Sequence, residues 1–169
     1  MSADTALQTI AVGVIVERSK GMSEWTEYLW RPVDVLIGAP VTPSWTKLGG
    51  DDERTRFYCG STQIEFHRTE TANYRSNLAT GKPQLWVALR PVDSNPPYEL
   101  FAVTADPAEG EALTESGNNI VEPVAMPEVV EAALTGFIAE HHVERTVYKR
   151  KRERGNPEAL GRRPPENRK

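Results

Sequence analysis

The sequence predicts a single α+β domain, residues 9–146, with a mainly antiparallel sheet and about three helices. Three stretches support this fold class. Residues 10–17 (IAVGVIVE) are apolar on both faces of an extended chain, which is typical of a central strand. Residues 55–67 have the pattern of two short strands joined by a tight turn. Residues 127–152 have the pattern of one amphipathic helix that packs on the sheet and then runs into a basic tail.

The composition is that of a globular domain. The chain has 169 residues, of which 38% are hydrophobic and 26% are charged. No apolar run approaches the ~20 residues that span a membrane, and residues 1–8 lack the basic and apolar regions of a secretory signal. Cys59 is the single cysteine, which excludes an internal disulfide. We therefore expect a cytoplasmic protein that does not insert into membranes.

Charge is distributed unevenly along the chain. Residues 145–169 carry ten Lys and Arg against three Asp and Glu, whereas residues 1–144 carry ten against 21. The balances of +7 and −11 together give the net charge of −4. An acidic body repels phosphates, so a nucleic-acid partner is not expected. Residues 147–169 are predicted to be a disordered basic tail, because they contain too few apolar side chains to offset the entropy cost of ordering.

The first half of the chain is predicted to consist of strands and loops. A disordered start over residues 1–8 precedes the central strand. Residues 24–30 fit one or two helical turns. Residues 30–37 are predicted to form a strand, in which Pro32 requires an edge position or a place among the first residues. Residues 49–53 are predicted to be a polar, glycine-rich loop.

A β-hairpin is predicted over residues 55–67, with Gly60 and Ser61 as a two-residue turn. In the register that this turn sets, Arg56 lies opposite Glu65 as a cross-strand pair of opposite charge. The apolar side chains predicted to share the other face are Phe57, Ile64 and Phe66.

Two short helices are predicted in the second half. The first, residues 70–80, is expected to be capped by Thr69 and closed by Gly81. The second is expected to begin with Asp106 as its N-cap and Pro107 at its first position. The strands expected around these helices are residues 85–89, 98–104 and 120–124, of which the first two form a second hairpin.

The long C-terminal helix is predicted to begin with Pro127 at its first position. Its apolar side chains recur with a period near 3.6 residues, and His141 and His142 continue the same stripe. The residues expected to cover the sheet are Val130, Leu134, Phe137 and Ile138.

The three histidines of the sequence do not indicate a metal site. Adjacent residues on a helix diverge by roughly 100°, so His141 and His142 are not expected to bind one ion. A favourable position at the negative end of the helix dipole explains both more simply. In the predicted hairpin His67 lies on the polar face, away from the core.

No catalytic residue and no cofactor are predicted either. Cys59 has no cationic neighbour or helix N-terminus in the local sequence that would lower the pKa of its thiol. Gly49 and Gly50 resemble a nucleotide-binding loop weakly, because no apolar strand precedes them and no helix is expected to follow. The acidic residues from Asp51 to Glu53 would also repel phosphate.

Tryptophans and the basic tail are the candidates for binding a protein partner. Trp86 is expected in the core, whereas three other tryptophans lie near loops, where they either pack in the core or form an exposed aromatic patch. We expect residues 143–154 to order only on an acidic partner surface; the alternatives are a solvated tail or one that contacts its own acidic body. The candidate partner-binding residues are Trp25, Trp30, Arg31, Trp45, His141, His142, Tyr148, Lys149, Arg150, Lys151 and Arg152.

Several stretches resemble one bacterial family, the domain-of-unknown-function family 3305. These stretches cover most of residues 10–152, and they are VGVIVERSKGMSEW, WRPVDVLIGAP, RFYCGSTQIEFHRTETANYRSNL, PQLWVALRP, NIVEPVAMPE and EHHVERTVYKRKR. Members of this family are often labelled as molybdopterin-guanine dinucleotide biosynthesis proteins, and their genes tend to lie near those of formate dehydrogenase.

The resemblance implies a role in the maturation of a molybdenum enzyme. The expected function is that of a non-catalytic accessory protein that binds a formate dehydrogenase subunit or its maturation factors. The alternative that the family label implies is a nucleotidyltransferase of molybdenum cofactor biosynthesis. The resemblance provides no catalytic residues to place on this sequence.

Overall fold

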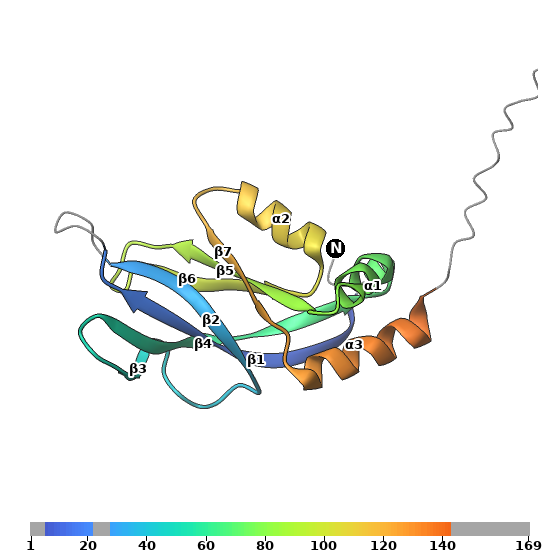
Figure 1. The fold of residues 1–169 in the computed structure, drawn as a ribbon, viewed down its shortest axis with the longest axis horizontal. Coiled ribbons are helices and arrows are strands. Elements are labelled where there is room, and N and C mark those ends of the chain that lie inside the picture. Colours follow the sequence, from blue (N-terminus) through green and yellow to red (C-terminus); the bar gives the residue numbers. More distant parts are fainter. Residues whose placement is uncertain (1–5, 22–27, 143–169) are drawn as a thin grey trace, which may run out of the picture.

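The computed structural model of the protein describes residues 6–21 and 28–142, in which seven strands form two antiparallel sheets (Figure 1). The strands are β1 (Ala6–Ser19), β2 (Leu29–Ile37), β3 (Thr46–Gly50), β4 (Arg54–His67), β5 (Gln84–Pro91), β6 (Tyr98–Thr104) and β7 (Ile120–Ala125). The helices are η2 (Arg68–Glu70), α1 (Thr71–Ala79), α2 (Pro107–Glu115) and α3 (Glu128–His141). The predicted α+β class is confirmed.

The two sheets enclose one core. The first sheet has the strand order β2-β1-β4-β3, and the second has the order β6-β5-β7. β6 runs close to β4, and β7 runs close to β2, so the second sheet lies over the first (Figure 1). Alternate residues of β1 and β5 point into the space between the sheets. The fully buried members of this set are Val12, Val14, Val16, Leu85, Val87 and Leu89.

β1 is a central strand, as predicted, and it pairs with β2 on one side and β4 on the other. It begins at Ala6, inside the stretch 1–8 that the sequence predicts to be disordered. β2 is the outer strand of its sheet, which agrees with the edge position that Pro32 requires. The rest of the predicted start, most of residues 24–30 and the predicted tail from 147 lie outside the described residues.

The predicted hairpin at Gly60 and Ser61 is wrong. β4 continues through both residues without a turn, and its full length pairs with β1. The register shifts by one residue at Cys59, between the pairs Val14–Gly60 and Ile15–Tyr58, as in a β-bulge. A Cβ atom on Gly60 would lie 3.2 Å from Ser44 Oγ. The φ angle of Gly60 is 150°, which side chains rarely adopt, so the backbone of the bulge and the nearby β2–β3 connection both favour glycine here without a turn.

Loss of the turn also changes the side-chain pairing. Arg56 does not meet Glu65, because the two residues lie on the same strand. Its ion-pair partner is Glu17 on β1. Ile64 and Phe66 are fully buried, as the alternation of the sequence predicts. The prediction identified the inward face of β4 and failed on its connectivity.

The helices cover the open parts of the core. Val130, Leu134 and Phe137 of α3 are buried against it, as predicted, and Ile138 is partly buried. α2 lies on the outside of the second sheet, where Gly110 contacts Trp86 so closely that a Cβ atom would lie 2.6 Å from Trp86 Cγ. The partly buried Trp86 thus packs beneath a helix and does not reach the central core.

The helix starts agree with the predictions in part. Asp106 caps α2 as expected, since its Oδ1 accepts from the Ala108 N–H at 2.9 Å. The cap predicted at Thr69 is wrong, because a turn of 3₁₀-helix fills residues 68–70 and α1 starts at Thr71. Pro127 precedes the first turn of α3 and does not belong to it, a difference of one residue.

Candidate functional site

Aromatic side chains gather at the end of the domain away from α3. Trp30 on β2 is the centre of this group. Its ring centroid lies 5.5 Å from that of Trp45, 5.9 Å from that of Phe57 and 6.4 Å from that of Tyr98. Tyr28 adds an edge-on contact with Trp30 at 6.4 Å. We call these five residues the aromatic cluster; Trp30, Trp45 and Tyr98 pack against the core but remain partly exposed.

Trp45 has a backbone conformation that is uncommon for a bulky residue. Its φ angle is 65°, in the left-handed region. Such a conformation costs of order 1 kcal/mol or more and persists only when surrounding contacts enforce it. Here the Trp45 N–H donates to the Tyr58 carbonyl at 2.6 Å, and the indole packs edge-on against Trp30 and Phe57. The fold therefore holds this indole in a fixed position at the surface.

Arg18 on β1 lies over the aromatic cluster. Its Cζ atom is 4.1 Å from the ring centroid of Tyr28, 5.3 Å from that of Phe57 and 5.9 Å from that of Trp30. A guanidinium stacked on rings is held in one orientation while its N–H groups stay available at the rim. Arg18 and the aromatic cluster together form what we call the aromatic end.

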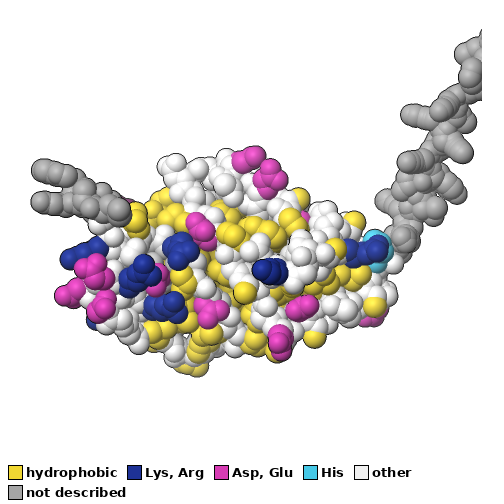
Figure 2. Space-filling view, viewed as in Figure 1, with side chains coloured by type: hydrophobic (Ala, Val, Ile, Leu, Met, Phe, Trp, Pro, Cys, Tyr) yellow, Lys and Arg dark blue, Asp and Glu magenta, His cyan; other side chains and the backbone are white. Residues whose placement is uncertain are grey.

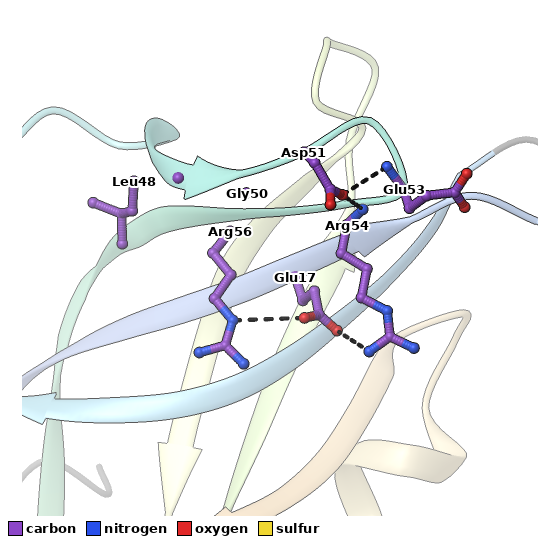
Figure 3. A pocket seen from close by; sticks show the side chains of 8 residues that line it. Glu17, Leu48, Gly50, Asp51, Glu53, Arg54 and Arg56 are labelled. Atoms are coloured by element: carbon purple, nitrogen blue, oxygen red, sulfur yellow. Dashed lines mark hydrogen bonds and ion pairs between the residues drawn. The ribbon is translucent and has the colours of Figure 1, made fainter.

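A second feature lies on the outer face of the first sheet, a shallow pocket of about 570 Å³. At its floor the Glu17 carboxylate lies between Arg54 and Arg56, with N···O distances of 4.0 and 3.5 Å (Figure 3). The Glu17 side chain is only 10% exposed, whereas the two arginines are 70% and 54% exposed. The remaining lining residues are Leu48, Gly49, Gly50, Asp51 and Glu53.

The rim of this pocket is a tight turn between β3 and β4. Asp51 Oδ1 accepts hydrogen bonds from the backbone N–H groups of Glu53 at 2.9 Å and Arg54 at 3.0 Å (Figure 3). These hydrogen bonds hold the pKa of the Asp51 carboxyl below its ordinary value, and the bond from the Arg54 N–H has the largest effect. The acidic loop predicted to repel phosphate is thus the turn of a hairpin, and its aspartate stabilises that turn.

Charge also distinguishes this end of the molecule. Residues 17–20, 28–34 and 45–56, the part of this end that belongs to β1–β4 and their loops, carry six Lys and Arg against five Asp and Glu, a balance of +1. The other described residues carry four against twelve, a balance of −8. Figure 2 shows Lys and Arg side chains intermixed with acidic ones at the left end, and further acidic side chains over α2 at the top. An acidic partner would therefore meet the least repulsion at this end.

The structure brings together some of the predicted partner-binding residues. Trp30 and Trp45 meet in the aromatic cluster. Arg31 is exposed on β2, where it lies opposite Glu17 in the register. Six further candidates lie outside the described residues, namely Trp25, Tyr148, Lys149, Arg150, Lys151 and Arg152. Whether these residues bind a partner stays a prediction.

His141 and His142 lie at the opposite end and have different neighbours, because His141 ends α3 whereas His142 is its C-cap and has an extended backbone. The ring of His141 stacks on Phe137 at 4.5 Å. His142 bridges to α1, with Nδ1 2.8 Å from Thr71 Oγ1 and Nε2 2.9 Å from Arg75 Nη1. Because a guanidinium only donates, Nε2 accepts and Nδ1–H donates to the threonine. The described residues contain no group of three or more side chains arranged to hold a metal.

Cys59 and the pair Gly49 and Gly50 are the two other features that the sequence analysis considered for chemistry. Cys59 is buried, and burial raises the pKa of its thiol to about 12, which leaves almost no thiolate at neutral pH. Gly49 and Gly50 belong to β3 and lead through the Asp51 turn into another strand. They do not open a helix, whose N-terminal N–H groups would bind phosphate.

Sequence reasoning missed the residues that complete the aromatic end. Arg18, Tyr28, Phe57 and Tyr98 were not among the predicted partner-binding residues. Arg18 lies opposite Trp30 in the register of β1 and β2, a pairing that the sequence analysis did not predict. Tyr98 joins the cluster from the second sheet, which no local pattern of the sequence reveals.

Comparison with known proteins identifies the family of the chain. A family model, DUF3305, described as a protein of unknown function, matches residues 11–152. The chain belongs to this family. The resemblance predicted from the sequence is confirmed at that level. Comparison with curated proteins and with solved structures gave no match. Among the described residues, no helix is long and apolar enough to cross a membrane.

Proposed function

We propose that this DUF3305 protein is a non-catalytic accessory protein that binds a molybdoenzyme, such as formate dehydrogenase, during its maturation in the cytoplasm. The aromatic end is the proposed docking surface, and it is the observation that carries the proposal. Tryptophan, tyrosine and arginine are the residue types that dominate the binding energy of protein interfaces. The partner class comes from the labels and gene neighbourhood that the family resemblance implies.

Three properties of the aromatic end support a binding role. Tyr28 is 45% exposed and the neighbouring Leu29 is 51% exposed, so the surface offers apolar area to a partner. The ring contacts and the enforced backbone of Trp45 fix the surface in advance, which lowers the entropy cost of association. The stacked Arg18 adds N–H donors for a carboxylate on the partner.

The alternative is a nucleotidyltransferase, and one observation favours it. Gly49, Gly50 and two arginines line the same pocket, a combination that could meet a phosphate group. Against it, the carboxylates of Glu17, Asp51 and Glu53 line that pocket too. Isothermal titration with GTP and Mg²⁺ separates the two functions. Micromolar affinity for GTP would favour the nucleotidyltransferase over the accessory protein that we propose.

The docking surface is tested with the purified catalytic subunit of formate dehydrogenase immobilised on a sensor. We expect the Tyr28→Ala and Arg18→Gln variants to bind about tenfold or more weakly than the wild type, as hot-spot residues do. Phe101→Ala is the matched control, because Phe101 is similarly exposed, at 41%, on β6. Equal affinity of the wild type and the three variants would exclude the aromatic end as the docking surface. No capture of the wild type would exclude formate dehydrogenase as the partner.

A further inference from the structure

The connection between β2 and β3 is an exposed loop without charged side chains. Residues 35–46 contain no Asp, Glu, Lys, Arg or His, although 26% of the whole chain is charged. The side chains of Leu36, Ile37 and Val41 are 38%, 44% and 102% exposed. We call residues 36–44 the apolar loop; it projects below the first sheet in Figure 1, and hydrophobic side chains gather at the same place in Figure 2. Exposed apolar side chains grouped in this way, unlike ones scattered singly, mark an interaction surface.

Both ends of the apolar loop are fixed to the first sheet. The Gly38 N–H donates to the Ala11 carbonyl on β1 at 2.8 Å. Just after the loop, the Trp45 N–H donates to the Tyr58 carbonyl on β4 at 2.6 Å. Val41 lies midway between these hydrogen bonds, and among the described residues it is the most exposed large apolar side chain. The fold therefore presents Val41 to solvent from a fixed base.

Two prolines restrict the backbone of the apolar loop in advance. Residues 39–43 have the sequence APVTP, in which two residues separate Pro40 from Pro43. A proline ring fixes its own φ angle at about −65° and disfavours the helical region for the residue before it. Because Ala39 and Thr42 precede the prolines, four of these five residues have a restricted backbone before any partner binds. Such restriction lowers the entropy cost of association.

The chemistry of the loop indicates what it contacts. Extended segments with two prolines at this spacing bind in grooves lined by aromatic side chains. The valine between the prolines gains free energy only where apolar side chains replace water around it. A groove that carried unpaired charges would lose their hydration, because residues 35–46 offer no charge to compensate. The fitting partner is therefore an uncharged groove on a protein.

Two pockets on the described part of this protein are unsuitable for the apolar loop of a second copy. The first, described above, is lined by Glu17, Asp51 and other charged residues. The second lies between β4 and β6 and is lined by Glu65 and Glu109, among others. An uncharged loop in either pocket would take carboxylates out of water without pairing them. These pockets favour a different protein as the partner.

Charge also argues against a membrane as the partner. The balances of +1 and −8 for the two parts of the described body add to −7. Anionic lipid headgroups repel such a body, and residues 35–46 carry no Lys or Arg to attract them. An uncharged groove on a protein does not produce this repulsion.

We propose that the apolar loop inserts into an uncharged groove of a partner protein, lined by aromatic and aliphatic side chains. Val41 fills a pocket in this groove, and Pro40 and Pro43 contact its walls on either side. Trp45 follows the loop directly and belongs to the aromatic cluster, so one partner can contact both surfaces. This inference rests on the protein-binding function proposed above and adds the chemistry of a second contact.

Photo-cross-linking from position 41 tests the inference without assuming which protein is bound. The full chain carries p-benzoylphenylalanine in place of Val41, and the control carries it in place of Val129, which is 58% exposed on α3. Both proteins are irradiated in an extract of the cells that produce the chain naturally, and mass spectrometry identifies the cross-linked residues. We expect one protein to be cross-linked from position 41 about tenfold more than from position 129, through residues of an uncharged apolar groove.

A synthetic peptide of residues 34–47 provides a matched competition. In excess it should lower the cross-linking from position 41 about fivefold, whereas the same peptide with Val41→Asp should not, because an apolar groove does not hydrate a carboxylate. In the full chain, Val41→Asp should weaken binding to the identified protein about tenfold or more. The melting temperature of this variant should equal that of the wild type, since Val41 is entirely exposed.

Other results would overturn the inference. Equal cross-linking from positions 41 and 129, or cross-linking that the peptide does not reduce, would show that no specific groove receives the loop. Cross-links to a charged surface would reject the apolar chemistry. Binding to phosphatidylcholine and phosphatidylglycerol vesicles, if lost in Val41→Asp, would indicate a membrane instead. Dimerisation in ultracentrifugation, if lost in the same variant, would indicate a second copy of the chain.

The function proposed above fails in a different way. Specific cross-linking to a protein other than formate dehydrogenase would retain the inference and reject the partner named above. Capture of formate dehydrogenase that depends on Tyr28 and not on Val41 would retain the aromatic end as the docking surface and reject the loop. The two failures are therefore distinguishable.

Discussion

At the scale of single residues, burial fixes the protonation of two side chains along β4 and α1. The thiol of Cys59 and the hydroxyl of Tyr74 both have their pKa raised to about 12, in each case chiefly by desolvation. Tyr74 uses its protonated hydroxyl, which accepts from the His67 N–H at 2.9 Å and donates to the Glu65 carbonyl. Cys59 has no comparable bond among the described residues, so its thiol serves as a small apolar group.

The raised pKa of Cys59 leads to a prediction about its reactivity. At pH 8 a thiol with a pKa near 12 has a thiolate fraction of roughly one in ten thousand. We expect Ellman's reagent to label Cys59 only as fast as the native chain unfolds, and rapidly once guanidinium chloride has unfolded it. Native labelling within minutes at pH 8 would show that the thiol is accessible and reactive.

The same pKa fixes the sign of a stability change. A pKa that is higher in the folded state than the ordinary value near 9 contributes stability in full below pH 9. This contribution is lost as the pH rises from 9 to 12. Denaturant unfolding of the Cys59→Ala variant should therefore show a weaker fall in stability over that window than the wild type.

At the scale of elements, α3 joins the helical side of the domain to the sheets. The ring of Phe137 lies 5.3 Å from that of Phe66 on β4 and 6.2 Å from that of Tyr74 on α1. At the end of α3, His142 bonds with Thr71 and Arg75 of α1. One helix thus fixes α1 and the end of β4 relative to each other.

Phe137 should therefore be a large contributor to stability. The side chain is 2% exposed, and its removal leaves a cavity between three elements. We expect Phe137→Ala to lower the free energy of unfolding by about 3–5 kcal/mol, measured by chemical denaturation. Val129→Ala is the control on the same helix, since Val129 is 58% exposed and should change stability by less than about 0.5 kcal/mol. Similar effects of the two changes would contradict this packing.

At the scale of the whole molecule, the sequence predicted the class of the fold better than its assembly. Local signals were sufficient for two elements: the period of α3 identified the buried face that contains Leu134, and the two apolar faces of residues 10–17 identified β1 as a central strand. The glycine at position 60 was misleading, because a turn and a bulge beneath a loop both require it. Its role depends on Ser44, which is distant in the sequence.

The candidate site shows the same limit. Trp30 and Trp45 were predicted as surface candidates because of their residue type and their proximity to loops. Their contact, and the addition of Tyr98, depends on how β6 of the second sheet lies relative to the first. The pocket also requires the pairing of β1 with β4, which brings Glu17 to Arg56. Local patterns contain no information about these pairings.

Charge at the scale of the chain leads to the last prediction. The described body away from the aromatic end has a balance of −8 and repels an acidic partner, whereas residues 146–169 carry nine Lys and Arg against three Asp and Glu. These basic residues should therefore speed encounter with an acidic partner and have less effect on final affinity. Every described helix and strand ends before residue 143. Truncation after Arg145 should thus leave the melting temperature unchanged.

The association rate of the truncated protein distinguishes this role from a merely solvated tail. Screening acts within about 8 Å at physiological salt. The truncated protein should bind formate dehydrogenase several-fold more slowly than the full chain at low salt, and the two rates should converge as salt rises. Replacing Lys149, Arg150, Lys151 and Arg152 by glutamine at full length should reproduce most of the loss, since it removes charge and retains length. Identical rates for the full and truncated chains at low salt would leave these residues without a role in capture.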